Sequence, residues 1–242
     1  MKSNKKSTVS QEITPQQVER HISVIRKAPI LILDANLGLD TINFVLEECQ
    51  NSKIPVFFEP TDKNKGSAVL KSPHIGALTY ASPNLAELRM FAGSNEDEEK
   101  DAEKNLNDLL RECLQLSLAV LDTIPFLIVT LGDRGVLVVR RGHDTDPLPL
   151  KNASNLRKES AVSAKHYPVN PFENVISVVG AGDCFTGAFV AALLNGLDQD
   201  LAVSVGIQAA RLSLANEKTV PFDLSSKKIH WEKIVSNGRR LA

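Results

Sequence analysis

The sequence predicts an α/β domain with a mainly parallel sheet, and three observations support this. Apolar runs alternate with amphipathic segments along the chain, which is typical of strands that alternate with helices. The runs are continuous rather than alternating, as expected for strands in a parallel sheet that is covered on both faces. The 242 residues, 43% hydrophobic and 24% charged, suffice for one sizeable core.

The first half of the chain is expected to hold three strands and three helices. The strands are predicted at 29–34, 55–59 and 75–80, and the helices at 40–50, 84–91 and 102–121. The run PILILD at 29–34 is expected to be buried on both faces of the sheet. Residues 60–65 are expected to form a loop, and the acidic residues 95–101 suit the positive end of a helix dipole.

The second half begins with the strongest strand signal, PFLIVTL at 125–131. Further strands are predicted at 136–139 and 161–167, a turn at 132–135, an exposed excursion at 140–160, and helices at 184–194 and 201–214. The polar residues 1–12 are expected to be disordered, which leaves 13–242 as one domain. Ligands in such folds bind at the carboxyl ends of the strands.

Composition argues against several classes of partner and site. A net charge of −1 gives no reason to expect nucleic acid or a membrane surface. Cys49, Cys113 and Cys184 are odd in number and lack CxxC spacing, so neither a disulfide framework nor a zinc site is expected. Residues 1–12 lack the apolar core of a signal peptide, and a reducing, cytoplasmic location is expected.

The most informative feature is the stretch Gly180–Asp183, which lies between an apolar strand signal and an amphipathic helix signal. Glycines allow close backbone approach, and the first amides of a helix form an anion site. Asp183 lies where a carboxylate could take a proton from a substrate hydroxyl. The alternative is an ordinary strand-to-helix turn with Asp183 as N-cap. The loop lacks the Lys-Ser/Thr ending of a Walker A motif, and Phe185 occupies the third glycine position of the dinucleotide fingerprint.

Three motifs in order resemble those of the ribokinase (pfkB) carbohydrate kinases. Residues 179–189 (VGAGDCFTGAF) resemble the second family signature, 82–87 (SPNLAE) the N-x-x-E motif, and 129–135 (VTLGDRG) the T-x-G-x-x-G nucleotide loop. The resemblance runs over about 13–239. It implies a three-layer ribokinase-like fold, ATP-dependent phosphorylation of an alcohol group, and ATP and Mg²⁺ as cofactors.

The resemblance also implies roles at the glycine loop. The amides of Gly180, Ala181 and Gly182 would stabilise charge on the transferring phosphoryl group, and Asp183 would contact the substrate and remove the proton of its 5′-hydroxyl. Phosphoryl transfer depends mainly on positioning and charge stabilisation, so a short amide cradle with one base is chemically reasonable.

A second set of roles concerns magnesium. Asn84 and Glu87 would place Mg²⁺ and phosphate, acting through water, since both offer the oxygen ligands that this hard cation prefers. The alternative is a helix start with a capping pair that involves Ser82 or Asn84 with Glu87.

The remaining implied roles concern the nucleotide and the substrate. Thr130, Gly132 and Gly135 would line the ATP phosphates and ribose, although the glycines alone also fit a plain hairpin turn. Asn216 would border the adenine. Asn36 would contact the sugar or base, and an Asn at a strand-to-helix junction is equally well explained as a cap.

Within the family, further short segments resemble the pseudouridine kinases. These segments are LDANL at 33–37, FEPTD at 58–62, ARLSL at 210–214 and VP at 220–221. The resemblance implies a small-molecule substrate, pseudouridine or another nucleoside or sugar. It also leaves open a homodimer, or a fusion with a pseudouridine-phosphate glycosidase in longer forms.

The chain departs from the family pattern in two places. Ser177 stands where the family usually has an aspartate that helps to bind a monovalent cation, so potassium activation is not implied. The N-terminal strands, the β lid and the glycine-rich sugar signature of the family have no counterpart here. Two other hypotheses therefore stand beside the kinase: a catalytically weak fragment that binds nucleotide or a partner chain, and a nicotinamide-dependent oxidoreductase that fits only the coarse α/β pattern.

Overall fold

The described part of the chain folds around one seven-stranded sheet. The computed structural model describes residues 13–61, 63–94, 104–151, 161–222, 224 and 237–241. The strands, which follow chain order across the sheet, are β1 (Leu31–Asp34), β2 (Val56–Glu59), β3 (Leu78–Ala81), β4 (Phe126–Thr130), β5 (Val136–Arg141), β6 (Val162–Tyr167) and β7 (Arg239–Arg240). Strands β1–β4 are parallel, and β5, β6 and β7 each pair antiparallel with the preceding strand. Five of the seven strands thus share one direction, so the predicted mainly parallel sheet is confirmed.

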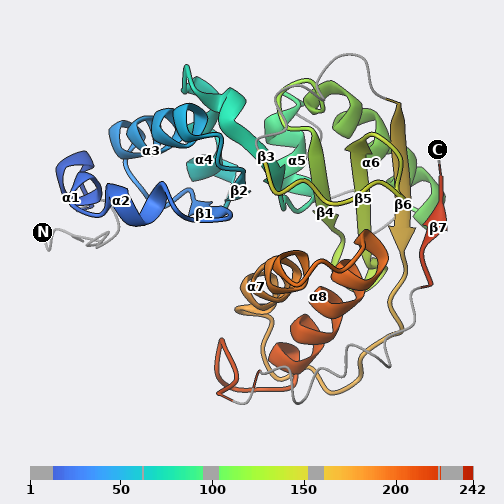
Figure 1. Ribbon diagram of the computed structural model, residues 1–242. Coiled ribbons are helices and arrows are strands. Elements are labelled where there is room, and N and C mark those ends of the chain that lie inside the picture. The colour runs from blue at the N-terminus through green and yellow to red at the C-terminus, as the bar shows by residue number, and fades with distance from the viewer. Residues whose placement is uncertain are drawn as a thin grey trace, which may run out of the picture.

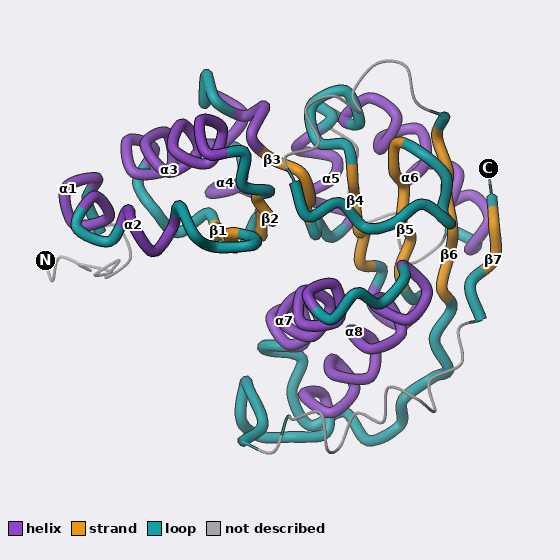
Figure 2. Tube along the Cα trace, viewed as in Figure 1, coloured by secondary structure: helices purple, strands orange, loops and turns teal. Residues whose placement is uncertain are grey.

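Helices cover the sheet on both faces, which gives the predicted three layers. Helices α3 (Leu39–Ser52), α5 (Leu85–Phe91) and α6 (Leu106–Val120) pack on one face, in a core that includes Leu46, Leu88 and Cys113. Helices α7 (Ala181–Leu194) and α8 (Gln199–Leu214) pack together on the other face, against the strands between β2 and β6. Figures 1 and 2 show this pair below the sheet and α3 beside β1 and β2.

Strand β1 corrects one prediction. It is an edge strand whose only partner in the described sheet is β2. Leu33 is buried in the α3 core, but Ile32, which points to the opposite face, is 49% exposed. Helix α7 reaches Phe57 and Tyr80 through Phe189 but leaves Ile32 half uncovered. The expectation of burial on both faces is therefore wrong for this strand, because continuous apolar sequence does not reveal where a helical layer ends.

Several element boundaries also differ from the predictions. The predicted loop 60–65 contains a short helix, α4 (Lys63–Gly66), and the first part of the predicted strand 75–80 is the 3₁₀ turn Ile75–Ala77. Two helices begin earlier than predicted, α7 at Ala181 and α8 at Gln199. The sequence signals missed α1 (Pro15–Glu19), α2 (Ile22–Ile25), the 3₁₀ turn Val69–Lys71 and β7, whereas the predicted turn at 132–135 is confirmed as the 3₁₀ turn Gly132–Arg134. The missed elements are short and have little apolar periodicity.

Some predictions concern parts of the chain that the structure leaves undescribed. The disordered segment 1–12, the acidic residues 95–101 and residues 152–160 of the predicted excursion lie outside the described residues. The extent of the domain, 13–242, therefore stays a prediction. The predicted start of the excursion is wrong, because Arg140 and Arg141 belong to β5 and Arg140 is only 2% exposed. Among the residues that are described, no helix combines the length and apolar character needed to cross a bilayer.

Candidate active site

The glycine loop opens helix α7. Gly180 is the N-cap residue, with φ 88° and ψ −3°, a left-handed conformation that favours glycine. A Cβ at this position would lie 2.3 Å from the carbonyl oxygen of Thr219, so the chain also passes too close for any larger residue. Gly180, not Asp183, therefore caps the helix, which explains why α7 starts three residues earlier than predicted. The N-cap interpretation of Asp183 is wrong.

The first turn of α7 has the geometry of an anion site. The amides of Ala181, Gly182 and Asp183 lie in this turn, where amides have no acceptor within the helix and the helix dipole is positive. A Cβ placed on Gly182 would meet no atom within 4 Å, so open space lies beside the turn. Asp183 is exposed. A phosphate-sized anion therefore has room beside these amides, with the Asp183 carboxyl in the same turn.

A cavity of about 410 Å³ brings this turn together with the loop after β4. Among the residues that line it are five of the predicted site residues: Thr130, Gly132, Gly135, Ala181 and Gly182. Gly135 is in a left-handed conformation, φ 92°, and a Cβ there would lie 2.1 Å from the carbonyl oxygen of Tyr167. Two glycine turns from distant parts of the sequence thus border one cavity.

The rest of the cavity lining is largely apolar. It includes Phe172, Ile207 and Ala210, and the guanidinium of Arg211 lies 5.3 Å from the centre of the Phe172 ring. Sequence reasoning assigned no ligand role to these residues, although a family segment at 210–214 pointed to the helix. Asn216, predicted to border the adenine, is not among the lining residues, and its Oδ1 accepts from the amide of Lys218 at 2.9 Å.

The Asn84–Glu87 pair forms a capping box, which is the alternative that the sequence offers to a magnesium site. Asn84 Oδ1 accepts from the Glu87 amide and Glu87 Oε2 accepts from the Asn84 amide, both at 2.9 Å. The amide of Thr130 donates to the carbonyl of Pro83 at 2.9 Å, which ties this helix start to the turn after β4. The pair therefore has a structural role, whatever else it binds.

The same pair can be tested against the expected magnesium ion. Among the residues that the structure describes, no three acidic, histidine or cysteine side chains gather closely enough to hold a metal ion directly. The oxygens of Asn84 and Glu87 suit Mg²⁺ in kind, and Mg²⁺ commonly keeps several waters and binds substrate phosphates. The residues present thus fit an ion held mainly by water and phosphate, not a protein cage.

Asn36 follows β1 and has a fixed orientation. Its Nδ2 donates to Asp34 Oδ2 at 2.9 Å, its backbone amide donates to Asp34 Oδ1 at 3.0 Å, and Lys65 Nζ donates to its Oδ1 at 2.7 Å. Because an ammonium group only donates, the Lys65 contact sets which way the Asn36 amide points. Asn36 is therefore held by two charged neighbours at the carboxyl end of the strand.

Sequence reasoning missed a polar cluster beside the glycine loop, formed by Glu59, Ser82 and Thr186. Thr186 Oγ1 donates to Glu59 Oε2 at 3.0 Å and lies 3.4 Å from Ser82 Oγ. Burial, with a smaller contribution from the charges of Glu87 and Asp183, raises the pKa of Glu59 to about 8, although the hydrogen bonds with Thr186 and Ser82 act in the opposite direction. The available signal was a carboxylate at the end of an apolar strand, where ligands bind in this class of fold.

Ser177 shapes the segment that leads into the glycine loop. Its hydroxyl accepts from the amide of Val179 at 3.2 Å, and its own amide donates to the carbonyl of Leu214 at 3.3 Å. The residue that replaces the family aspartate thus makes a local turn and anchors this segment to the end of α8.

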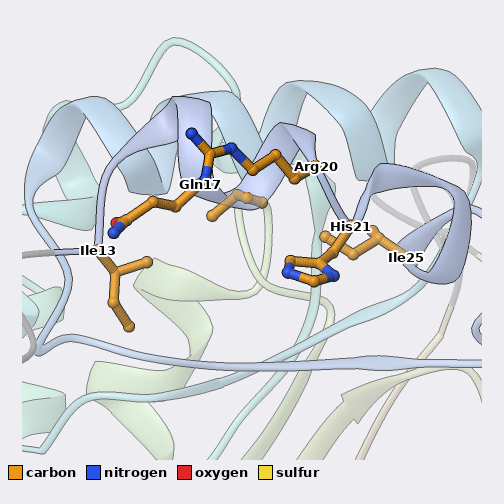
Figure 3. Close-up of a pocket in the computed structure, with 6 residues that line it drawn as sticks. Ile13, Gln17, Arg20, His21 and Ile25 are labelled. Atoms are coloured by element: carbon orange, nitrogen blue, oxygen red, sulfur yellow. The ribbon is translucent and has the colours of Figure 1, made fainter.

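A second hollow, of about 500 Å³, lies at the N-terminal helices and is drawn in Figure 3. It is lined by Ile13, Gln17, Val18, Arg20, His21 and Ile25. Most of these side chains are exposed, and none is a predicted site residue. The cavity at α7 is therefore the better candidate for the active site.

The three-layer α/β fold, with a glycine-capped helix beside a cavity, places the protein in the ribokinase-like class. The chain belongs to the pfkB family of carbohydrate kinases, whose family model matches residues 3–225. It is 27% identical over 267 residues to a pseudouridine kinase of Arabidopsis thaliana, covering 95% of this chain and 68% of the relative. A pseudouridine-metabolizing bifunctional protein of Schizosaccharomyces pombe is 25% identical over 78% of this chain and 29% of its own length.

Solved structures show the same fold. A putative sugar kinase from Clostridium perfringens has a TM-score of 0.69 at 15% identity and matches 94% of this chain and 62% of its own. A ribokinase of Arabidopsis thaliana complexed with ribose and ATP has a TM-score of 0.60 at 18% identity and matches 90% and 60%. This chain thus spans about three fifths of the length of these kinases. Family membership favours phosphoryl transfer over the nicotinamide hypothesis.

Proposed function

We propose that the protein transfers the γ-phosphoryl group of ATP to the 5′-hydroxyl of a nucleoside or sugar, with pseudouridine as the first candidate substrate. The observation that carries the proposal is the shared cavity: the first turn of α7 and the loop Thr130–Gly135 border the same space. An anion site and a glycine turn beside one apolar-walled cavity fit a nucleotide whose phosphates point toward Asp183.

The role of Asp183 follows from its place in the first helical turn. The carboxylate accepts the proton of the attacking hydroxyl, while the amides of Gly180, Ala181 and Gly182 stabilise the charge on the transferring group. Holding these groups together on one helix start keeps base and anion site in fixed relation. A positioned general base contributes about 10²–10⁴-fold to the rate.

The other predicted residues take supporting roles in this proposal. Thr130, Gly132 and Gly135 lie along the nucleotide phosphates and ribose, and Asn216 lies near the adenine. Asn84 and Glu87 contribute oxygen ligands toward hydrated Mg²⁺, which would neutralise phosphate charge. Asn36, held by Asp34 and Lys65, contacts the nucleoside or sugar.

The substrate is the least constrained part of the proposal. Support for pseudouridine comes from the names of two relatives, a pseudouridine kinase and a pseudouridine-metabolizing bifunctional protein. The test measures ADP release with pseudouridine, adenosine, ribose and fructose 6-phosphate, each with ATP and Mg²⁺. Turnover with another substrate but not with pseudouridine would reject the pseudouridine assignment and keep the kinase.

The edge strand β1 favours a second candidate function, a nucleotide-binding chain with weak activity that joins a partner chain. The described sheet leaves one edge of β1 without a neighbouring strand, and Ile32, on the sheet face that α7 and α8 cover further along, is 49% exposed. ATP binding measured by calorimetry without turnover of any of the four substrates supports this candidate. Robust turnover by the isolated chain rules it out.

A further inference from the structure

The cluster of Glu59, Ser82 and Thr186 lies between the elements that carry the candidate catalytic residues. Glu59 ends β2, and its backbone carbonyl accepts from the amide of Ala35 at 3.1 Å, so its main chain is fixed within the sheet. Ser82 and Thr186 are only 3% and 4% exposed. Buried polar groups that lose their partners destabilise a protein strongly, so this contact set has a defined geometry.

The two hydroxyl groups of the cluster come from the two segments that carry candidate catalytic residues: Thr186 from α7 and Ser82 from the segment before α5. Thr186 lies three residues after Asp183 on α7, and residues at this spacing are neighbours on one side of a helix. Ser82 comes two residues before Asn84, the N-cap of α5. The bond from Thr186 to Glu59 joins positions 127 apart in sequence. Glu59 is thus the point where the Asp183 helix and the Asn84–Glu87 helix start meet the sheet.

Glu59 lies near the carboxylates of Glu87 and Asp183, but it is not arranged as a metal ligand. The carboxylates of Glu87 and Asp183 both lie close enough to act electrostatically on the Glu59 carboxyl. Yet no group of acidic side chains among the described residues is arranged to hold a metal ion. The contacts of Glu59 are with hydroxyl groups, which suits a residue that acts through its neighbours.

We propose that Glu59 is a positioning residue that holds the first turn of α7, with Asp183, in place against the Asn84–Glu87 helix start through its bond with Thr186. The proposal rests on the proposed kinase function for its kinetic consequence. The consequence follows from geometry, because displacing a catalytic group by about 1 Å lowers rates by roughly 10²-fold.

The kinetic test uses matched substitutions at both ends of the bond. Thr186→Val keeps the shape but removes the hydroxyl, and we expect kcat to fall about 10- to 100-fold with KM for ATP nearly unchanged. Thr186→Ser keeps the hydroxyl and should retain kcat within about threefold. The double variant Glu59→Ala/Thr186→Val should lose no more than the worse single variant, because both remove the same bond.

A control separates positioning from general weakening of the fold. Thr41 is 3% exposed, its hydroxyl donates to the carbonyl of Ile13 at 2.8 Å, and it does not line the cavity at α7. Thr41→Val should lower the thermal midpoint but leave kcat unchanged. Equal kcat in the wild type and Thr186→Val, or independent multiplicative losses in the double variant, would overturn the proposal.

A second readout does not depend on activity. Hydrogen exchange of the intact chain should become at least tenfold faster in Glu59→Ala for peptides from the starts of α5 and α7, with β5 and β6 unchanged. Exchange as slow as in the wild type at both helix starts would also overturn the proposal. If the wild type phosphorylates no tested substrate, the kinase function fails, and this exchange measurement alone decides the role of Glu59.

Discussion

Replacing Gly180 by alanine places a methyl group where the backbone of Thr219 already lies. The added Cβ would be 2.3 Å from the Thr219 oxygen and 2.8 Å from its carbonyl carbon. That oxygen is held in place, because it accepts from Ser213 Oγ at 2.9 Å and from Cys184 Sγ at 3.6 Å. The left-handed conformation, φ 88°, adds a further penalty for any residue with a Cβ. Relief therefore requires the glycine loop or the Thr219 segment to move.

The expected loss of stability in Gly180→Ala is the sum of a backbone penalty and a steric penalty. The left-handed conformation costs roughly 1–2 kcal/mol for alanine and the forced packing about 1–3 kcal/mol, which gives a loss of roughly 2–5 kcal/mol in the free energy of unfolding. For a chain of this size, the thermal midpoint should fall by roughly 5–15 °C. Because the first α7 turn moves, kcat should fall by about 10²-fold or more even where the variant is folded.

The assay compares Gly180→Ala with Gly187→Ala on the same helix. A Cβ at Gly187 would meet nothing within 4 Å, so alanine there should raise stability by up to about 1 kcal/mol through helix propensity. Thermal unfolding followed by circular dichroism gives both values. A Gly180→Ala midpoint equal to that of the wild type, or an equal loss in both variants, would refute the account of this loop.

Three further results are expected. Because the pKa of Glu59 is raised from 4.5 to about 8, the free energy of unfolding should decline by at most roughly 5 kcal/mol as pH rises from about 4.5 to 8. Chemical denaturation at several pH values measures this decline, and Glu59→Gln should flatten it. A Glu59→Gln variant with the same pH dependence as the wild type would contradict this prediction. Lys65→Met removes the donor to Asn36 Oδ1 and should raise KM for the nucleoside about tenfold with KM for ATP unchanged, so a selective rise in KM for ATP would argue against the substrate role. Gly135→Ala forces a Cβ to within 2.1 Å of the Tyr167 oxygen and should weaken ATP binding measured by calorimetry, whereas wild-type affinity would show that the turn adapts.

Local sequence signals were enough to predict the central elements of the sheet. The apolar run of β4 and the glycine turn before β5 predicted this antiparallel pair, because an apolar run and the residues of a turn are both local features of the sequence. The limit of the helical layer is not local. Ile32 belongs to a run as apolar as β4, yet it is half exposed because α7 and α8 pack over strands further along the sheet.

In the candidate site, too, the sequence predicted the features that depend on local residues and missed those that depend on distant contacts. The glycine loop and the Thr130–Gly135 turn were visible because glycine is needed for their left-handed conformations. The Glu59–Thr186 bond joins residues 127 apart, and no pattern within either segment indicates the other. The apolar cavity wall from α8 was likewise hidden, since a helix face that lines a ligand cavity has the same periodicity as one that packs in a core.

The most direct test of the kinase proposal is phosphoryl transfer by the wild type and by Asp183→Asn, followed by ³¹P NMR with ATP, Mg²⁺ and pseudouridine. We expect a new phosphomonoester signal that couples to the 5′ protons of the product. In the variant, product formation should be at least 10²-fold slower while ATP binding is retained. Formation of the same product at the wild-type rate by Asp183→Asn would contradict the assignment of Asp183 as the base.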